Sequence, residues 1–310
     1  MNPPKIAVVG SANIDLVIRS KRIPDKGETI FGDSLDIFTG GKGFNQGTAA
    51  ARLGADVTFI GKIGDDNFGE MLQNAMTSEM INTHHLSVDT NVGTGIANIL
   101  VDPDGENSII VIPRANMCIT STEIDKATES ISEVDILLLQ LETPIEASIR
   151  ATEIAKETNT TVILDPAPAK SLPEQFLSQI DILTPNTSEA EHLTGIPTNT
   201  IDSCVDAGKV LQQKLSQERY AAVVMTLGKN GVLLVTDNHT EHISPVSVDT
   251  VDTTGAGDAF TGALATALGK SKNLRESVDF ANVAGAAAVT VLGATPSMPT
   301  ISKIESLMIK

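Results

Sequence analysis

The chain has 310 residues, which is enough for one large domain or two smaller ones with a substantial core. Hydrophobic residues make up 41% and charged residues 20%, as in ordinary globular proteins, and the formal net charge of −17 opposes binding to nucleic acids or anionic membranes. Cys118 and Cys204 show no disulfide or metal-binding pattern, so we expect reduced thiols in a cytoplasmic protein. We expect neither a signal peptide nor a membrane span, since the longest apolar run, 281–294, is too short.

The chain as far as residue 112 mixes strands with helices. Strands are predicted over 5–9, 14–20, 29–38, 57–60, 95–101 and 108–112, and helices over 43–53 and 67–80. The last two strands form a hairpin that turns at Pro103-Asp104-Gly105. His84 and His85 are placed in a polar connection, and we expect no metal site there because cysteine and carboxylate ligands at suitable spacing are missing.

After residue 114, short apolar strands alternate with helices. The strands are predicted over 135–139, 161–164, 181–183 and 222–225, and the helices over 144–157, 187–194 and 202–216. Segments 231–235 and 239–243 indicate an antiparallel edge, and helices near 256–269, 275–290 and 300–309 close the chain. This alternation predicts an α/β fold with a doubly wound, mostly parallel sheet flanked by helices. The earlier β-segments do not fit that sheet, so we expect them to form a small lid sheet over one end of it.

The most informative stretch is Asp252-Thr253-Thr254-Gly255-Ala256-Gly257-Asp258. Its glycines allow a tight turn at the start of a helix, where unpaired N–H groups and the helix dipole attract an anion. Asp258 adds a carboxylate beside that anion, which is useful if the carboxylate takes a proton from a nucleophile attacking the anion. The stretch therefore favours phosphoryl transfer. The alternative is an acidic first helical turn whose glycines serve close packing.

A second glycine cluster, Gly40-Gly41-Lys42-Gly43-Phe44-Asn45, also marks a turn from a strand into a helix. It is not a Walker A loop, and neither cluster is a complete dinucleotide-binding fingerprint. Asn45 can donate and accept hydrogen bonds at once, which suits a vicinal diol, and Asp15 can accept from two sugar hydroxyls. Each residue alone is also explained as part of a turn.

Three further groups fall where strands end. Asp165 follows the strand over 161–164, and the glycine-containing loop 226–231 can border a nucleotide or form a plain hairpin turn. Asn186 and Glu189 share one face at a helix start, and a capping box explains them equally well. Ligands of open α/β sheets bind outside the carboxyl ends of the strands, so we expect these groups to converge on one site.

Together these motifs resemble the ribokinase branch of the phosphofructokinase-B family of sugar kinases. The resemblance runs from Val8-Val9-Gly10-Ser11-Ala12-Asn13-Ile14-Asp15 to Gly293-Ala294-Thr295-Pro296-Ser297. Both family signatures are present, namely 40–45 with Ala51-Arg52-Leu53-Gly54, and 252–258, while Gln140-Leu141-Glu142-Thr143-Pro144 matches a sugar contact of the branch. The resemblance implies one domain over residues 1–310, with a lid sheet formed by about 13–39 and 94–113.

The resemblance also implies roles for the matching positions. Asp258 would be the catalytic base, and the anion hole would consist of Gly255, Ala256 and Gly257. The sugar would be held by Asn13, Asp15, Gly41, Lys42, Gly43, Asn45, Glu142 and Asp258. Mg²⁺ and phosphate would be organised by Asn186 and Glu189, and ATP would be bordered by Thr226, Leu227, Gly228, Lys229, Asn230, Gly231, Gly257 and Asn282. A K⁺ ion would be held by Asp252, Thr254, Ala288, Val291, Gly293 and Ser297.

The activity implied is ATP-dependent phosphorylation of D-ribose at its 5-hydroxyl, in a homodimer that pairs through the lid sheets. Open alternatives are the same chemistry on 2-deoxyribose, fructose or a nucleoside such as adenosine, and a non-catalytic sugar- or nucleotide-binding protein of the same fold. The incomplete glycine fingerprint disfavours an NAD-dependent dehydrogenase. Arg114 departs from the family pattern near the expected sugar pocket, and Gly47 replaces an alanine, which should weaken its helix by up to about 1 kcal/mol.

Overall fold

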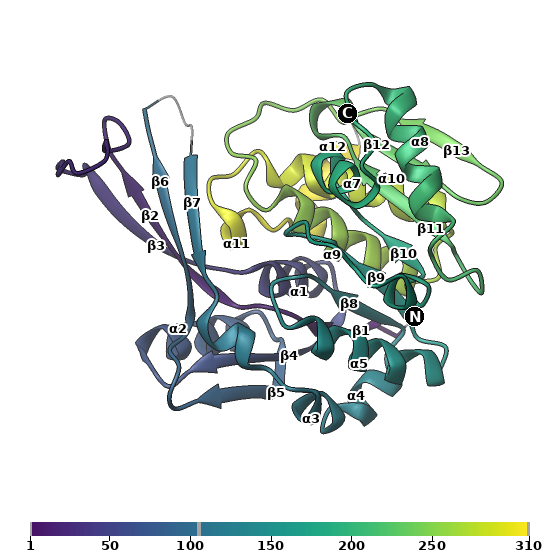
Figure 1. Ribbon diagram of the computed structural model, residues 1–310, viewed down its shortest axis with the longest axis horizontal. Coiled ribbons are helices and arrows are strands. Elements are labelled where there is room, and N and C mark those ends of the chain that lie inside the picture. Colours follow the sequence, from purple (N-terminus) through teal and green to yellow (C-terminus); the bar gives the residue numbers. More distant parts are fainter. Residues whose placement is uncertain (1, 104–106, 309–310) are drawn as a thin grey trace.

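Two β-sheets organise the chain, a large one through the body and a small one beside it (Figure 1). The computed structural model describes residues 2–103 and 107–308. Within these ranges the large sheet has nine strands, in the order β13 (Thr240–Ile243), β12 (Val232–Val235), β11 (Ala222–Thr226), β10 (Ile182–Leu183), β9 (Thr161–Leu164), β8 (Ile136–Leu139), β1 (Lys5–Val9), β4 (Asp56–Gly64) and β5 (Asn82–Asp89). The small sheet has the order β3 (Ser34–Gly40), β2 (Asn13–Arg19), β6 (Gly95–Val101) and β7 (Asn107–Ile112).

The large sheet is mostly parallel. Neighbouring strands from β5 to β11 run parallel, whereas β12 and β13 are antiparallel to their neighbours. These pairings confirm the predicted parallel sheet and its antiparallel edge near 231–243. Strands that are buried on both faces were the easiest to predict, because their sequences are short unbroken apolar runs.

The prediction of a polar connection around His84 and His85 is wrong, because both residues lie in β5. This strand is at the edge of the sheet and is only half buried, so polar side chains replace the apolar run of the inner strands. His85 Nε2 lies 2.9 Å from Ser130 Oγ. Across the described ranges, no group of three or more His, Cys, Asp and Glu side chains is placed to hold a metal ion.

Helices cover both faces of the large sheet. One face is packed by α1 (Lys42–Arg52), α2 (Asn67–Ser78), α9 (Ala256–Gly269), α10 (Leu274–Ala288) and α12 (Ile301–Met308). The opposite face is packed by α3 (Ser121–Asp125), α4 (Thr128–Ser132), α5 (Ile145–Glu157), α6 (Glu174–Leu177), α7 (Thr187–Thr194) and α8 (Ile201–Gln212). Connections contain α11 (Ala294–Ser297) and the 3₁₀ helices η1 (Arg114–Cys118) and η2 (Gly228–Asn230). The doubly wound arrangement is therefore confirmed, although the helix predicted over 202–216 ends at Gln212.

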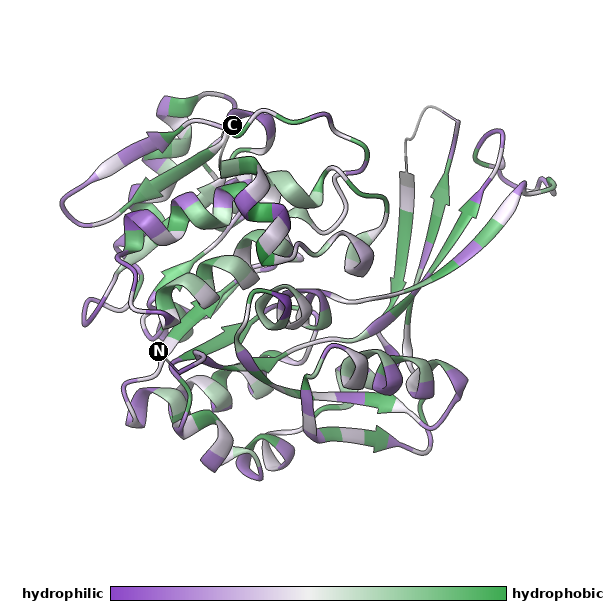
Figure 2. Cartoon of the chain, turned by 180° about the vertical axis from the view of Figure 1, so that it is seen from behind, coloured by the Kyte–Doolittle hydropathy of each residue, from purple (hydrophilic) through white to green (hydrophobic). Residues whose placement is uncertain are grey.

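The two faces of β1 show how the core is divided. Ile6 and Val8 point into the core on the α1 side, whereas Ala7 and Val9 point into the core on the α5 side, as the two-residue period of a strand requires. Figure 2 shows the resulting hydrophobic strands between more polar helices. In the part of the chain that the structure describes, none of the helices is long and apolar enough to cross a lipid bilayer.

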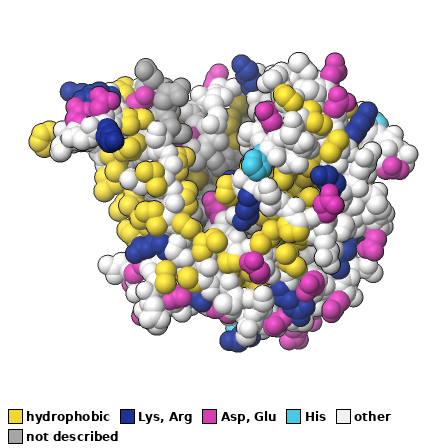
Figure 3. Space-filling view, viewed as in Figure 1, with side chains coloured by type: hydrophobic (Ala, Val, Ile, Leu, Met, Phe, Trp, Pro, Cys, Tyr) yellow, Lys and Arg dark blue, Asp and Glu magenta, His cyan; other side chains and the backbone are white. Residues whose placement is uncertain are grey.

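The small sheet is separate from the large one, as the sequence predicts. β2 pairs with β3 antiparallel and with β6 parallel, and β6 pairs with β7 antiparallel. Large apolar side chains remain exposed on this sheet (Figure 3), among them Leu35, Ile37, Ile109, Ile110, Val111 and Ile112. Most of the turn predicted at Pro103-Asp104-Gly105, namely Asp104 and Gly105, lies outside the described residues.

Candidate active site

The glycine turn before α9 is the centre of the candidate site. Gly255 has a φ of 78°, and a Cβ there would lie 2.8 Å from Met298 Cε, so glycine fits where other residues would be strained. α9 starts at Ala256, and among the described residues no side chain caps this N-terminus. The N–H of Ala256 donates to the main-chain oxygen of Thr253 at 3.3 Å, and the N–H groups that follow it in the first turn, with the positive end of the helix dipole, are available to an anion.

Asp258 lies in the first turn of α9 and is 6% exposed. Its Oδ2 accepts a hydrogen bond from Asn45 Nδ2 at 2.9 Å, and its Oδ1 accepts one from Gln46 Nε2 at 3.1 Å. Both donors belong to α1. The two helices approach closely because Gly262 has no side chain, and a Cβ there would lie 2.5 Å from the main-chain oxygen of Gln46. This packing brings the two glycine clusters together, as predicted.

A cavity of about 210 Å³ connects the glycine clusters to the strand ends. It is lined by Lys42, Asp165, Ala167, Thr184, Asn186, Glu189, Thr226, Thr253, Gly255, Gly257, Asp258 and Thr261. Burial raises the pKa of Asp165 to about 8, although the charge of Lys42 opposes this shift. Burial lowers the pKa of Lys42, but the nearby carboxylates, Asp258 foremost, outweigh it and leave the pKa above its usual value. The cavity thus combines carboxylates with a lysine that keeps its charge.

Asp15 lines a second cavity, of about 310 Å³, between the small sheet and the glycine turn. Burial, helped by the negative charges of Glu142 and Asp258, raises the pKa of Asp15 to about 7. Gly40 makes room for this carboxylate, because a Cβ at Gly40 would collide with it. The remaining lining residues are Val17, Arg19, Phe38, Ile99, Val101, Thr250, Val251, Asp252, Thr253, Thr254, Leu292, Gly293 and Ala294.

The other residues predicted to hold the sugar surround the start of α1. Gly41 has a φ of 92°, and a Cβ at Gly43 would lie 2.7 Å from the main-chain nitrogen of Ser11. Glu142 Oε2 accepts hydrogen bonds from Ser11 Oγ and from the main-chain N–H of Lys42, the latter at 3.1 Å. The structure therefore brings the sequence-distant Glu142 to the glycine cluster.

The sequence did not reveal the partners of the two asparagines at this site. Asn13 Oδ1 accepts a hydrogen bond from Asn116 Nδ2 at 2.7 Å, and Asn45 Oδ1 accepts one from Thr295 Oγ1 at 2.7 Å. Asn116 and Thr295 belong to segments far along the chain, and all four side chains are buried. A single threonine or asparagine in a connection gives no local signal of such a partner.

Asn186 and Glu189 form a reciprocal capping box at the start of α7. Glu189 accepts from the main-chain N–H of Asn186 at 2.7 Å and from its Nδ2 at 2.8 Å. Burial raises the pKa of Glu189, although hydrogen bonds from Asn186 and the charge of Lys42 act against the shift. Both residues also line the 210 Å³ cavity, so the pair caps α7 and at the same time lies beside the glycine turn.

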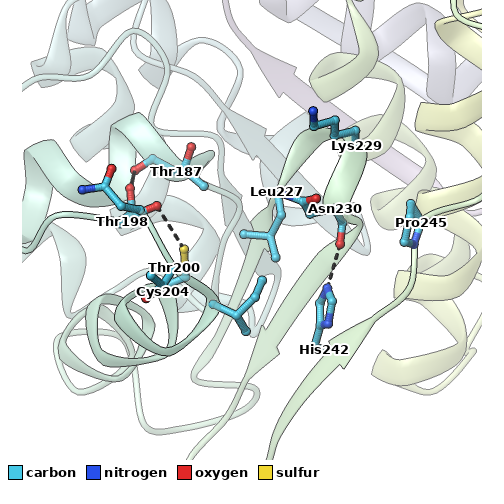
Figure 4. Close-up of a pocket in the computed structure, with 11 residues that line it drawn as sticks. Thr187, Thr198, Thr200, Cys204, Leu227, Lys229, Asn230, His242 and Pro245 are labelled. Atoms are coloured by element: carbon cyan, nitrogen blue, oxygen red, sulfur yellow. Dashed lines mark hydrogen bonds between the residues drawn. The ribbon is translucent and has the colours of Figure 1, made fainter.

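A larger cavity, of about 740 Å³, extends from the glycine turn along β11 and α10. The predicted nucleotide residues that line it are Asn186, Thr226, Leu227, Gly228, Lys229, Gly231, Gly257 and Asn282. Asn230 instead lines a neighbouring hollow of about 420 Å³ (Figure 4), where its main-chain oxygen accepts a hydrogen bond from His242 Nε2 at 2.7 Å. Val246, Val248 and Val289 give the larger cavity apolar walls.

Two of the predicted cation residues, Thr254 and Gly293, hydrogen-bond to the carboxylate of a third, Asp252. Its Oδ1 accepts from Thr254 N and Oγ1 at 2.9 and 2.7 Å, and its Oδ2 accepts from Gly293 N at 2.8 Å. Burial raises the pKa of Asp252, but these hydrogen bonds outweigh it and leave the pKa below its usual value. Ser297 Oγ donates to the main-chain oxygen of Ala294 at 2.7 Å. Two main-chain groups of the set are bonded to each other, since Val291 N donates to Ala288 O at 3.1 Å.

Arg114 does not line any of these four cavities. Its φ of 45° is left-handed, and its Nη1 donates to the main-chain oxygen of Thr94 at 3.3 Å. A Cβ at Gly93 would collide with the guanidinium, so Gly93 leaves room for it. The guanidinium of Arg114 therefore lies against Gly93 and Thr94, just before β6, and it does not line the 310 Å³ cavity of Asp15.

The fold and site define an α/β enzyme that transfers an anionic group, with a helix N-terminus and a buried carboxylate set between two cavities. The chain belongs to the pfkB family of carbohydrate kinases, whose family model matches residues 3–301. It is 40% identical over 295 residues to a ribokinase of Haemophilus influenzae, a match that covers 95% of each chain. It is 34% identical to a deoxyribokinase of Salmonella typhi, with 98% of each covered. A structure of Arabidopsis thaliana ribokinase complexed with ribose and ATP is 33% identical and superposes with a TM-score of 0.91 over 99% of both chains.

Proposed function

We propose that this protein transfers the γ-phosphoryl group of ATP to the 5-hydroxyl of D-ribose, giving D-ribose 5-phosphate and ADP. The observation that carries the proposal is the buried carboxylate of Asp258 beside the glycine turn at Gly255. The cavity of Asp15 adjoins this centre on one side and the 740 Å³ cavity adjoins it on the other. The similarity to a ribokinase over nearly the full length of both chains supports ribose as the acceptor.

In the proposed reaction the protein mainly positions two substrates and stabilises charge. Asp258 takes the proton of the sugar hydroxyl as that oxygen bonds to the γ-phosphorus. The N–H groups of Gly255, Ala256 and Gly257, at the start of α9, stabilise the charge on the transferred group. Lys42 keeps its charge in the same cavity and can contact that group as well as the sugar.

The sugar residues are assigned from the family resemblance, and among them Asp15 lines the 310 Å³ cavity and Lys42 the 210 Å³ cavity, whereas the nucleotide residues are assigned from the 740 Å³ cavity. We assign sugar binding to Asn13, Asp15, Gly41, Lys42, Gly43, Asn45 and Glu142. We assign ATP binding to Thr226, Leu227, Gly228, Lys229, Gly231, Gly257 and Asn282, which line the 740 Å³ cavity. Asn230 belongs to the same loop, but it lines the neighbouring hollow of about 420 Å³ and not the 740 Å³ cavity.

Two metal ions fit the residues around the turn. Asn186 and Glu189 offer oxygen ligands beside the 210 Å³ cavity, the kind that Mg²⁺ prefers, and a bound Mg²⁺ would neutralise phosphate charge. A K⁺ ion would be held next to the turn by oxygens of Asp252, Thr254, Ala288, Val291, Gly293 and Ser297. The lowered pKa of Asp252 keeps a negative charge available to such an ion.

The proposal is tested by measuring ADP release with a panel of sugars, for the wild type and for Asp258→Asn. General-base catalysis contributes about 10²–10⁴-fold, so kcat with ribose should fall at least about a hundredfold in the variant, while ATP still binds. Asp237→Asn, an exposed acid-to-amide change in a turn, is the matched control and should keep full activity. Near-normal turnover in Asp258→Asn would refute the assigned base.

The same panel decides between ribose and 2-deoxyribose. The 34% identity to a deoxyribokinase makes 2-deoxyribose the leading alternative acceptor. We expect kcat/KM to be highest for ribose, and a higher value for 2-deoxyribose, fructose or adenosine would reassign the substrate. If the protein binds ATP but phosphorylates none of the sugars, it is instead a non-catalytic homologue.

We also propose a homodimer that forms through the small sheet, in the cytoplasm. Exposed apolar side chains such as Leu35 and Ile110 gather on this sheet, and contiguous patches of this kind usually mark interaction surfaces. Cys118 and Cys204 are free thiols, as is usual in a reducing compartment. Sedimentation should give twice the monomer mass, and Ile110→Lys should shift the protein towards the monomer.

A further inference from the structure

Neighbouring residues of one helix hold the two oxygens of the Asp258 carboxylate. Asn45 Nδ2 donates to Oδ2 at 2.9 Å, and Gln46 Nε2 donates to Oδ1 at 3.1 Å. Successive positions of a helix point about 100° apart, so the two amides reach the carboxylate from different sides. Asn45 is also a proposed sugar ligand, whereas Gln46 has had no role so far.

Gln46 is fixed by a chain of buried hydrogen bonds. Its Nε2 also donates to Asp165 Oδ2 at 2.8 Å, and its Oε1 accepts from Gln140 Nε2 at 2.6 Å. Gln46 and Gln140 are both 0% exposed. The amide nitrogen of Gln46 faces the carboxyl groups of Asp258 and Asp165, which leaves its oxygen to accept from Gln140, and Gln140 must then present its own nitrogen. The acceptors at one end therefore determine the orientation of both amides.

The two amides differ in what a bound sugar would change. Asn45 binds a sugar hydroxyl in the proposed complex, so the entering sugar competes for the amide that holds Oδ2. Gln46 lines neither the 310 Å³ cavity nor the 210 Å³ cavity, although the two carboxylates that it holds, Asp165 and Asp258, line the latter. The Oδ1 contact therefore needs no exchange when a sugar enters.

We propose that Gln46 is a positioning residue that holds Oδ1 of Asp258 so that Oδ2 receives the proton of the sugar hydroxyl. This inference rests on the proposed kinase function. The hydroxyl oxygen forms a bond to the γ-phosphorus, the bond from that phosphorus to the bridging oxygen of ADP breaks, and the hydroxyl proton passes to Oδ2. Gln46 takes no part in the bond changes and acts only through the orientation of the carboxylate.

The test is Gln46→Met, which keeps the side-chain length and removes its hydrogen bonds. A misdirected base typically costs up to about a hundredfold, so kcat should fall tenfold to a hundredfold, while KM for ribose and for ATP stays within about threefold. Thr48→Val is the matched control, because Thr48 is fully buried on α1 and its Oγ1 has no partner among the described residues. This control should keep the wild-type kcat.

A second readout separates positioning from general damage to the fold. If Gln46 acts through Asp258, adding Gln46→Met to Asp258→Asn should cause little further loss, because the base is already gone. Equal losses in both backgrounds, or a folded Gln46→Met enzyme with kcat within twofold of the wild type, would overturn the proposal. Should Gln46→Met fail to fold, Gln140→Met must still lower kcat without raising KM. A wild-type enzyme that turns over none of the sugars would refute the kinase function itself, which is a different outcome.

Discussion

Replacing Gly47 by alanine should stabilise the protein. Gly47 lies in the middle of α1 and is buried, at a position with no left-handed backbone. A Cβ there would lie 3.6 Å from Val57 Cγ1, 3.7 Å from Val8 Cγ2 and 3.8 Å from Ile81 Cδ1. These are ordinary van der Waals distances, so a methyl group fills the space without displacing a neighbour.

The size of the effect follows from two terms. Glycine is about 1 kcal/mol less favourable than alanine in a helix interior. Burial of one extra methyl group against apolar neighbours adds up to about 0.8 kcal/mol. We therefore expect the free energy of unfolding of Gly47→Ala to exceed that of the wild type by about 1 to 2 kcal/mol. In a chain of this size that corresponds to a melting temperature roughly 1.5–3 °C higher.

Gly262→Ala is the matched control, with the opposite sign. Its Cβ would lie 2.5 Å from the main-chain oxygen of Gln46 and 2.8 Å from Ala49 Cβ, so α9 would have to move away from α1. Overpacking of this kind costs about 1–3 kcal/mol despite the better helix propensity. Urea titration and calorimetry measure both variants, and the ADP-release assay should show a loss of kcat for Gly262→Ala alone. A lower melting temperature for Gly47→Ala, or the same sign for both variants, would refute this reasoning.

Two further predictions concern the acids and the glycine beside them. The pKa of Asp165 is about 8 in the folded protein against about 3.9 for an unfolded aspartate, so its contribution to stability is complete below about pH 4 and is lost as the pH rises towards 8. The difference in unfolding free energy between Asp165→Asn and the wild type should therefore shift in favour of the variant by about 1 kcal/mol or more as the pH rises from 5 to 8. Urea unfolding measures this difference, and a difference that stays constant with pH would contradict the prediction. Gly40→Ala should raise KM for the sugar at least about tenfold with little change in KM for ATP, because its methyl would displace the Asp15 carboxylate; unchanged sugar affinity would rule this out.

Local patterns in the sequence were sufficient for the inner strands and the main helices. The strands Lys5–Val9 and Thr161–Leu164 are short apolar runs between turn residues, and the helix Ala256–Gly269 follows a glycine turn, so each has a clear local signal. The edge strand Asn82–Asp89 was missed because it is half exposed and polar. The short helices α3 and α4 have too few turns to show a helical period.

For the site, the sequence predicted which segments converge but not how the side chains pair. Asp258, Asn45 and Asp165 come together because strand ends and helix starts share one edge of the sheet. The hydrogen bonds of Gln46 could not be predicted, because its partners lie 94, 119 and 212 positions away and nothing local marks them. Asn230 shows the reverse case, since it belongs to a predicted nucleotide loop but faces the hollow on the far side.

The chain passes from β1 to β2 within a few residues, so the residues to which we assign sugar binding are divided between the small sheet and the helices of the body. Asp15 lies in strand β2 of the small sheet, whereas Asn45 and Asp258 lie in helices α1 and α9 of the body. A sugar that contacts all three side chains connects the small sheet to the body. Part of its binding free energy therefore offsets the cost of fixing the orientation of the two parts. Any contact on the outer face of the small sheet, such as a second copy of the chain, then becomes thermodynamically linked to sugar affinity.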